Sequence, residues 1–128
     1  MDEIRRTPPE WWLAQAREDL VTAEINLEAE RFYAAAFFAH QVAEKSLKFT
    51  ILALGQKMPY THSLRELSSV LDLPEAILDA ALDLAPEYGR AKCPYHAGGI
   101  PAQMCDSVRA QECIILARRV LDWAIDQQ

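Results

Sequence analysis

Residues 32–54 read FYAAAFFAHQVAEKSLKFTILAL and are the most apolar stretch of the chain. The polar residues of this stretch share one narrow helical face: His40, Gln41, Glu44, Lys45 and Lys48. The rest of the circumference is apolar or small. A helix with this pattern lies at the centre of a bundle and is covered on several sides. The stretch therefore predicts a central helix over about residues 31–54, ended by Gly55.

Helical periodicity continues before and after this segment, and alternating strand patterns are absent. A first helix is expected near Thr7, because Thr7 and Glu10 have the spacing of a capping box. A third helix is expected to begin after Thr61, which would be its N-cap, and a fourth is expected to begin near Pro74.

The last helix is expected to begin near Asp106 or Ser107. Its buried face is expected to comprise Val108, Ile115, Leu116, Val120 and Trp123. Together these patterns predict one all-α domain over residues 1–128, with its core at about residues 10–126. The expected architecture is an antiparallel bundle of four long helices plus a short fifth.

Composition and charge narrow the class of protein. The chain has 128 residues, no apolar run behind basic residues at its N-terminus and no apolar stretch long enough for a membrane span. We therefore expect a cytoplasmic protein without membrane contact, whose three cysteines are free thiols. The net charge of −6 argues against general nucleic-acid binding. Two stretches without acidic residues, 45–65 and 88–105, either form one basic patch or reflect ordinary scatter of charge.

Residues 89–99 read GRAKCPYHAGG and place Arg90 and His96 with five residues between them. Such a pair could bind a phosphate, because the planar arginine fork donates to its oxygens. It could also move a proton, because histidine titrates near neutral pH. Cys93 with His96 is only half of a zinc site, so we expect no metal. The alternative is that Arg90 and His96 lie in a surface turn, since such spacings also arise by chance.

The polar row in the central helix also has two interpretations. His40, Glu44 and Lys48 form either a polar seam at a contact or near a site, or a solvated face with one favourable Glu–Lys pair. His62 is interpreted as a residue that packs or hydrogen-bonds locally at a helix start, and the alternative is a functional role.

The chain matches a pattern of two motifs joined by a short loop, with one departure at Val42. The motifs are a helix core of the form A-x-Q-A-x-E-K-x-L-K and, after the loop, T-H-x-L-x-x-L. The matching residues are Ala39, Gln41, Ala43, Glu44, Lys45, Leu47, Lys48, Thr61, His62, Leu64 and Leu67. This combination resembles the HEPN family, the higher-eukaryote and prokaryote nucleotide-binding domain. The first helix and the closing residues 117–124 look similar as well.

The resemblance implies a helical bundle that usually forms a homodimer, in a family of RNases and RNA-binding modules. Small prokaryotic members are often the toxin half of a toxin–antitoxin pair, encoded beside a minimal nucleotidyltransferase. Catalytic members carry an arginine, four to six residues, and then a histidine near the start of the last long helix. The resemblance therefore implies Arg90 and His96 as catalytic residues, although Ala91 stands where active members commonly carry a polar residue.

The expected function is accordingly that of a metal-independent RNase without a cofactor. Its expected partners are a second copy, a nucleotidyltransferase antitoxin-like protein and RNA, which Lys92, Lys45 and Lys48 would contact. The alternative is a non-catalytic module that binds a nucleotide or the nucleotidyltransferase.

Overall fold

The computed structural model describes residues 7–127, and all of their regular structure is helical. The long helices are α2 (Pro9–Glu28), α3 (Phe32–Ala53) and α9 (Ser107–Asp126). A hairpin is formed by α4 (Leu64–Val70) and α5 (Glu75–Leu84). Single helical turns follow as α6 (Glu87–Arg90), α7 (Pro94–Ala97) and α8 (Pro101–Met104). The predicted all-helical bundle is confirmed, with three long helices and two shorter ones carrying most of its length.

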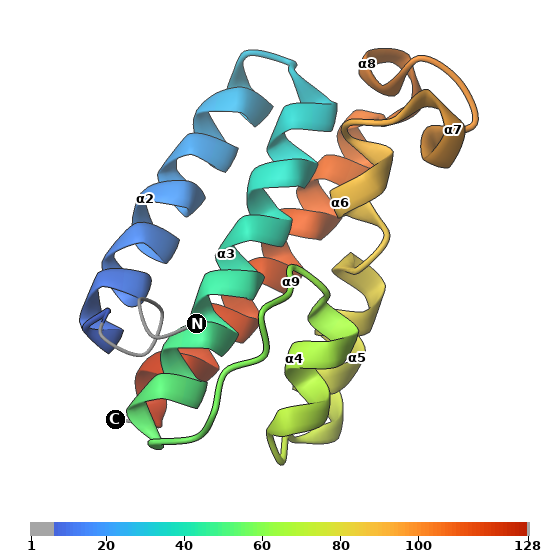
Figure 1. Ribbon diagram of the computed structural model, residues 1–128. Coiled ribbons are helices and arrows are strands. Elements are labelled where there is room, and N and C mark those ends of the chain that lie inside the picture. Colours follow the sequence, from blue (N-terminus) through green and yellow to red (C-terminus); the bar gives the residue numbers. More distant parts are fainter. Residues whose placement is uncertain (1–6, 128) are drawn as a thin grey trace.

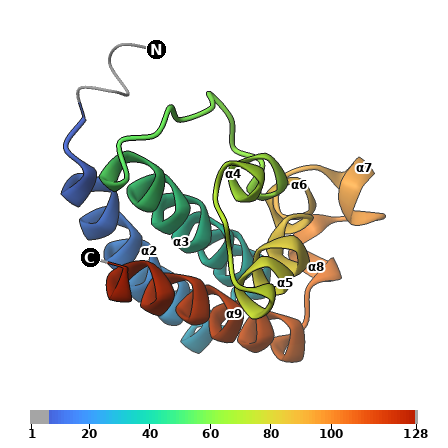
Figure 2. The ribbon, with the colours of Figure 1, turned by 90° about the horizontal axis from the view of Figure 1, so that it is seen from below.

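The central helix is α3, which packs against α2 and α9 and also contacts the α4–α5 hairpin (Figure 1). Helices that follow each other closely in the chain run antiparallel, as short connections predict; α2 and α3 are one such pair. In contrast, α3 and α9 run in the same direction, because α5 carries the chain back toward the end where α3 begins. Viewed from below, α2, α9 and the α4–α5 hairpin lie around α3, and α6, α7 and α8 lie together at one side (Figure 2). The starts of α3 and α9 therefore share one end of the molecule with the three single turns.

Small residues line the contacts of the central helix. The fully buried alanines of α3 are Ala35, Ala36, Ala39 and Ala43, and those of α9 are Ala110, Ala117 and Ala124. Short side chains let helix axes approach closely, so the buried face of α9 follows its alanines together with Cys113, Val120 and Leu121. The predicted burial of Val108 and Ile115 is wrong, because these side chains are 71% and 53% exposed.

The observed N-cap agrees with the predicted one for one helix and differs from it for two others. Asp106 caps α9, and its carboxylate accepts a hydrogen bond from the Arg109 backbone N–H at 2.8 Å, as predicted. The N-cap of α4 is Ser63 and not Thr61, because the Ser63 hydroxyl accepts from the Glu66 N–H.

The first helix starts one residue later than its expected capping box. Its N-cap is Pro8, which makes no side-chain cap hydrogen bond. A proline follows at the first helical position, where its fixed φ suits a helix start.

Within residues 7–127, none of the helices combines the length and the apolar character needed to cross a membrane.

Candidate functional site

The stretch between α6 and α8 breaks into single turns for reasons visible in its sequence. After Arg90 ends α6, the chain turns and restarts at Pro94, which occupies the first position of α7. Gly98 ends α7 with a φ of 75°, in the left-handed region that favours glycine. The chain therefore does not form a continuous helix through this stretch. Arg90 and His96 consequently lie on two different turns.

Both residues of the predicted pair line one cavity. This cavity has a volume of about 350 Å³ and is also lined by Tyr33 of α3, Met104 of α8 and Arg109 of α9. The structure thus brings the guanidinium of Arg90 and the imidazole of His96 to the same hollow. Tyr33 and Arg109 lie near the starts of α3 and α9, so the hollow is at the end of the bundle that these two helix starts share.

A buried carboxylate holds Arg90 in place. The Glu87 side chain is only 4% exposed, and its Oε1 accepts from Nη1 of Arg90 at 3.2 Å. The same oxygen accepts from Nε and Nη2 of Arg109 at 3.2 and 3.1 Å. Arg90 itself remains 52% exposed, so part of its guanidinium faces solvent at the cavity while the rest is anchored. Because an arginine has five N–H donors in a fixed fork, an anchored one can still donate to an anion.

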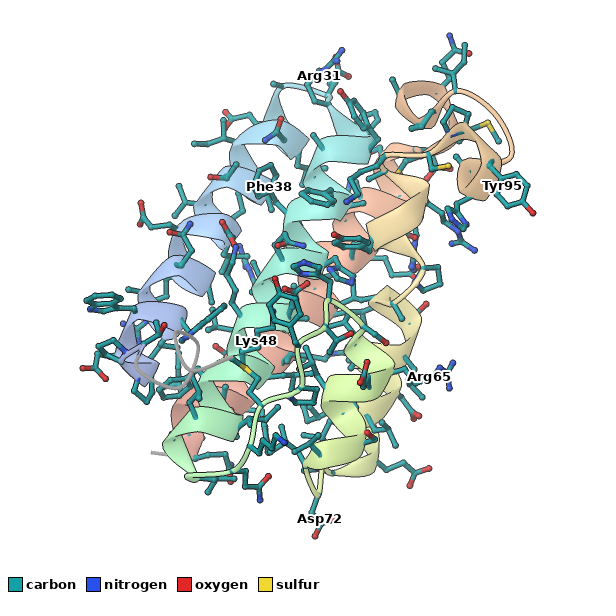
Figure 3. All side chains as sticks on the ribbon, viewed as in Figure 1. Arg31, Phe38, Lys48, Arg65, Asp72 and Tyr95 are labelled. Atoms are coloured by element: carbon teal, nitrogen blue, oxygen red, sulfur yellow. The ribbon has the colours of Figure 1, made fainter. Side chains whose placement is uncertain are left out.

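His96 lies against the backbone of Gly89. A Cβ atom at position 89 would be 3.0 Å from Cδ2 of the His96 ring, which is closer than ordinary side-chain packing allows. The bare glycine backbone therefore gives the imidazole its place beside α6. Tyr95, the neighbour of His96, is 88% exposed and projects from α7 away from the bundle (Figure 3).

The three predicted RNA-binding lysines lie in different surroundings. The ammonium of Lys45 pairs with the buried carboxylate of Asp19 on α2. Lys48 is buried, and its Nζ donates to Glu44 at 2.9 Å. Lys92 is exposed, with its Nζ 3.7 Å from the centre of the Tyr88 ring. Of the three, Lys92 is thus the one whose ammonium is exposed and close to the Arg90–His96 turns.

The polar row of α3 is not a solvated face. His40, Glu44 and Lys48 are 1%, 2% and 7% exposed, which overturns the interpretation as a solvated surface. The signal was present in the sequence, since the row sits within the most apolar helix and that helix is covered on several sides. Burial lowers the pKa of His40 from 6.5 to about 4, so its imidazole is neutral at neutral pH.

His62 reaches this buried row from the loop before α4. Its Nδ1 is 2.9 Å from Oε2 of Glu44, and its ring stacks on Tyr88 with centroids 5.3 Å apart and planes 13° apart. The interpretation of His62 as a purely local helix-start residue is therefore wrong, because its partners lie on α3 and α6.

Sequence reasoning missed Glu87, Arg109 and Tyr33 at the cavity. Glu87 precedes Arg90 by three residues, a spacing at which helical side chains meet, so that pair had a signal. Arg109 and Tyr33 had none, because only the tertiary fold brings them to this end.

The three cysteines of the chain are free thiols. Among residues 7–127, no group of three or more His, Cys, Asp or Glu side chains is placed to hold a metal ion. Burial raises the pKa of Cys105, which lines the cavity, to about 11, and that of Cys113 to about 12, so both thiols stay protonated near neutral pH.

The model of the HEPN domain family matches residues 9–128. The chain belongs to the HEPN family. Among solved structures, the HEPN chain is similar to TT1696 from Thermus thermophilus, at 32% identity and a TM-score of 0.87 over 94% of this chain and 98% of that one. It is also similar to ST0689, an archaeal HEPN homologue, at 30% identity and a TM-score of 0.84, with the same coverage of 94% and 98%.

A third structure, the HEPN domain protein TM0613 from Thermotoga maritima, is 25% identical with a TM-score of 0.67, over 91% of this chain and 95% of that one. No curated protein matches the chain. The HEPN fold therefore extends over nearly the whole chain, and the turns that carry Arg90 and His96 precede its last long helix, with α8 between them.

Proposed function

We propose that this HEPN protein is a metal-independent endoribonuclease. The observation that supports the proposal is the position of Arg90 and His96 on one cavity, with Arg90 anchored by a buried carboxylate. The arginine is suited to donate to the oxygens of a phosphodiester, where charge builds up as the 2′-oxygen attacks. The imidazole is suited to move the proton. Lys92, exposed on the turn between them, would hold the RNA backbone.

We further propose that the protein acts as the toxin-like half of a pair with a minimal nucleotidyltransferase, and that it works as a homodimer. Two copies that meet at the α6–α8 end would bring two such cavities together. Light scattering measures the oligomeric state. Co-expression with any minimal nucleotidyltransferase that is encoded beside the gene, followed by purification, tests the pairing. A monomer that does not co-purify with that protein would contradict both parts.

Ribonuclease activity is tested with purified protein and single-stranded RNA in the presence of EDTA. We expect cleavage, with a loss of about 100-fold or more for His96→Ala and for Arg90→Ala. Arg90→Lys should also lose activity, because it keeps the charge but not the fork.

Arg65→Ala is the matched control, because Arg65 projects from α4 away from the bundle (Figure 3). It should cleave like the wild type. Circular dichroism and thermal unfolding of each variant separate loss of chemistry from loss of fold. Full cleavage by both alanine variants of the pair would end the assignment.

A second candidate function is nucleotide binding without cleavage. The favouring observation is Tyr95, which is 88% exposed and packs edge-on against His96 with centroids 5.4 Å apart. An exposed aromatic ring beside an arginine-bearing cavity is suited to stack on a base. Calorimetric binding of a nucleotide by wild-type protein that leaves RNA intact, weakened in Tyr95→Ala, would favour this function over the ribonuclease.

A further inference from the structure

A second cavity shares His96 with the first. It has a volume of about 390 Å³ and lies between the start of α4, the end of α5 and the turns α6 and α7. Its lining includes His62, Tyr88 and Gly89 as well as His96. His96 therefore borders both cavities, with Arg90 on one and His62 on the other. Two exposed imidazoles face one hollow, and the proposed phosphate-binding arginine is next to it.

The ring of His62 has a fixed orientation. Its Nδ1 lies 2.9 Å from Oε2 of Glu44. Because a carboxylate only accepts hydrogen bonds, Nδ1 is the donor, and Nε2 is the nitrogen left to exchange protons. The nearly parallel stack on Tyr88 restrains the ring from one face. The side chain is nevertheless 62% exposed, so a substrate can reach it.

Burial of the Glu44 carboxylate lowers the stability of the fold. Its side chain is 3% exposed, and its Oε2 accepts from both Lys48 and His62. Its other oxygen, Oε1, is buried without a hydrogen-bond partner among the described residues and lies 3.9 Å from Nδ1 of His40. Incompletely satisfied buried charges are rare in native proteins and concentrate at functional sites. A buried carboxylate that orients an exposed imidazole is an arrangement that general acid–base catalysis uses.

We propose that His62 is a second proton-transfer residue of the site, that it works with His96 across their shared cavity, and that Glu44 is its positioning residue. This inference rests on the proposed ribonuclease function and deepens it, because cleavage of RNA requires two proton transfers at two different oxygens.

Atoms and electrons balance over the two transfers. One imidazole takes the proton of the 2′-hydroxyl while the 2′-oxygen forms a bond to phosphorus. The bond between phosphorus and the 5′-oxygen breaks, and its electron pair stays on that oxygen. The other histidine, as imidazolium, gives the 5′-oxygen a proton. The products are a 2′,3′-cyclic phosphate and a 5′-hydroxyl, and no water, metal or redox partner is consumed.

The first test compares His62→Ala and His62→Gln with wild-type protein on single-stranded RNA in EDTA. We expect kcat to fall about 100-fold or more in both, with little change in KM, since His62 acts in the chemical step. Added imidazole should restore part of the activity of His62→Ala, where the ring leaves a space, and not that of His62→Gln. Because His62 is exposed, both variants should fold.

The second test changes the leaving group. In uridine 3′-(4-nitrophenyl phosphate) the nitrophenolate departs without needing a proton. On this substrate, the loss of kcat should disappear in the variant that lacks the histidine acting as the acid. It should persist in the variant that lacks the histidine acting as the base. Losses that persist equally in His62→Ala and His96→Ala on this substrate would overturn the division of the two transfers.

The third test concerns Glu44. Glu44→Gln should lower kcat on RNA, and adding it to His62→Ala should cost no further activity, because Glu44 acts through His62. Asp19→Asn is the matched control, since Asp19 is also a buried carboxylate paired with a lysine of α3. It should lose stability without loss of kcat. An equal loss of kcat in Asp19→Asn would reduce Glu44 to a structural role.

The outcomes separate this inference from the function on which it rests. Wild-type protein that does not cleave RNA contradicts the ribonuclease proposal itself. Wild-type protein that cleaves, with His96→Ala inactive and both His62 variants fully active, contradicts only the role of His62.

Discussion

His40 shows what burial does to a single titratable residue. It is 1% exposed, and burial lowers its pKa from 6.5 to about 4. Glu44 opposes this shift, whereas the nearby positive groups of His62, Lys92 and Lys48 reinforce it. Between pH 6.5 and about 4 the unfolded chain therefore binds a proton at His40 that the folded protein does not. The free energy of unfolding must fall as the pH is lowered through this window.

This fall is measurable by replacing His40. From about pH 7.5 to about pH 4.5, His40 should remove about 2 to 3 kcal/mol from the free energy of unfolding of the wild type. His40→Leu, an apolar replacement of similar size, should lack this part of the fall. Urea unfolding at both pH values gives the comparison. Equal pH dependence in the two proteins would show that His40 keeps an ordinary pKa in the fold.

At the residue scale, the sequence predicts which side chains form a site better than it predicts the burial and contacts of those side chains. The spacing of Arg90 and His96 pointed to one site, and the two residues do line one cavity. Neither of the buried carboxylates behind the site was predicted. The burial of Glu44 had a signal in the apolar helix around it, whereas Glu87 has ordinary neighbours in sequence. The burial of Glu87 depends on helices that approach from elsewhere in the chain, which a local pattern does not contain.

At the scale of elements, the Arg109 side chain of α9 makes several polar contacts with the end of the hairpin, where α5 also packs against α9. The guanidinium of Arg109 donates to buried Glu87, to the backbone carbonyl of Asp83 at 2.9 Å and to Glu112 at 2.7 Å. Arg109 thus connects α9 with the last turn of α5 and with α6, the turn that carries Arg90. The same contact stabilises the bundle and fixes one wall of the cavity.

Arg109→Met should lower the free energy of unfolding by about 2 to 3 kcal/mol, because Glu87 loses its second arginine while staying buried. The estimate is at the low end for a buried pair, since Arg109 is 23% exposed and water screens part of the interaction. Arg118→Met is the control. Arg118 pairs with Glu24 at the surface, so its loss should stay below about 1 kcal/mol. Denaturant unfolding measures both, and equal losses would contradict the role assigned to Arg109.

The five main helices were predicted in the right order, although three of them are long and not four, and the single turns α6, α7 and α8 were not predicted. The orientation of helices about their axes was predicted less well. The last helix begins at Ser107 after its predicted cap, yet Val108 and Ile115 face solvent. Hydrophobicity alone favours the large apolar residues as the buried face. The close contact with α3 instead selects alanine, and alanines carry too weak a hydrophobic signal for the sequence pattern to reveal this choice.

At the scale of the whole molecule, the net charge of −6 leaves few places where RNA can bind. Lys45 and Lys48 neutralise Asp19 and Glu44 within the fold. Lys92 makes no such ion pair in the described structure and lies over Tyr88. Binding of RNA should therefore depend on the turns around Arg90, and its salt dependence should report the lysines that contact phosphates.

We expect Lys92→Gln to reduce the slope of log Kd against log salt concentration by about 0.7, the value for one phosphate contact to a single strand. Lys45→Gln should leave the slope unchanged, because its ammonium already pairs with Asp19. Fluorescence anisotropy with labelled single-stranded RNA, in a His96→Ala background that keeps the RNA intact, gives both slopes. A change for Lys45→Gln as large as that for Lys92→Gln would place the RNA on α3 as well.

The two buried glutamates have a shared consequence for ligand entry. The buried carboxylate of Glu87 contacts Arg90, and the buried carboxylate of Glu44 contacts His62 in the same way. Two solvent-facing side chains are therefore each held by a buried partner. Their rotamers are settled when the chain folds and not when a ligand arrives. A molecule that enters meets preorganised partners, and its association is spared about 0.5 to 1.5 kcal/mol of ordering entropy for each side chain.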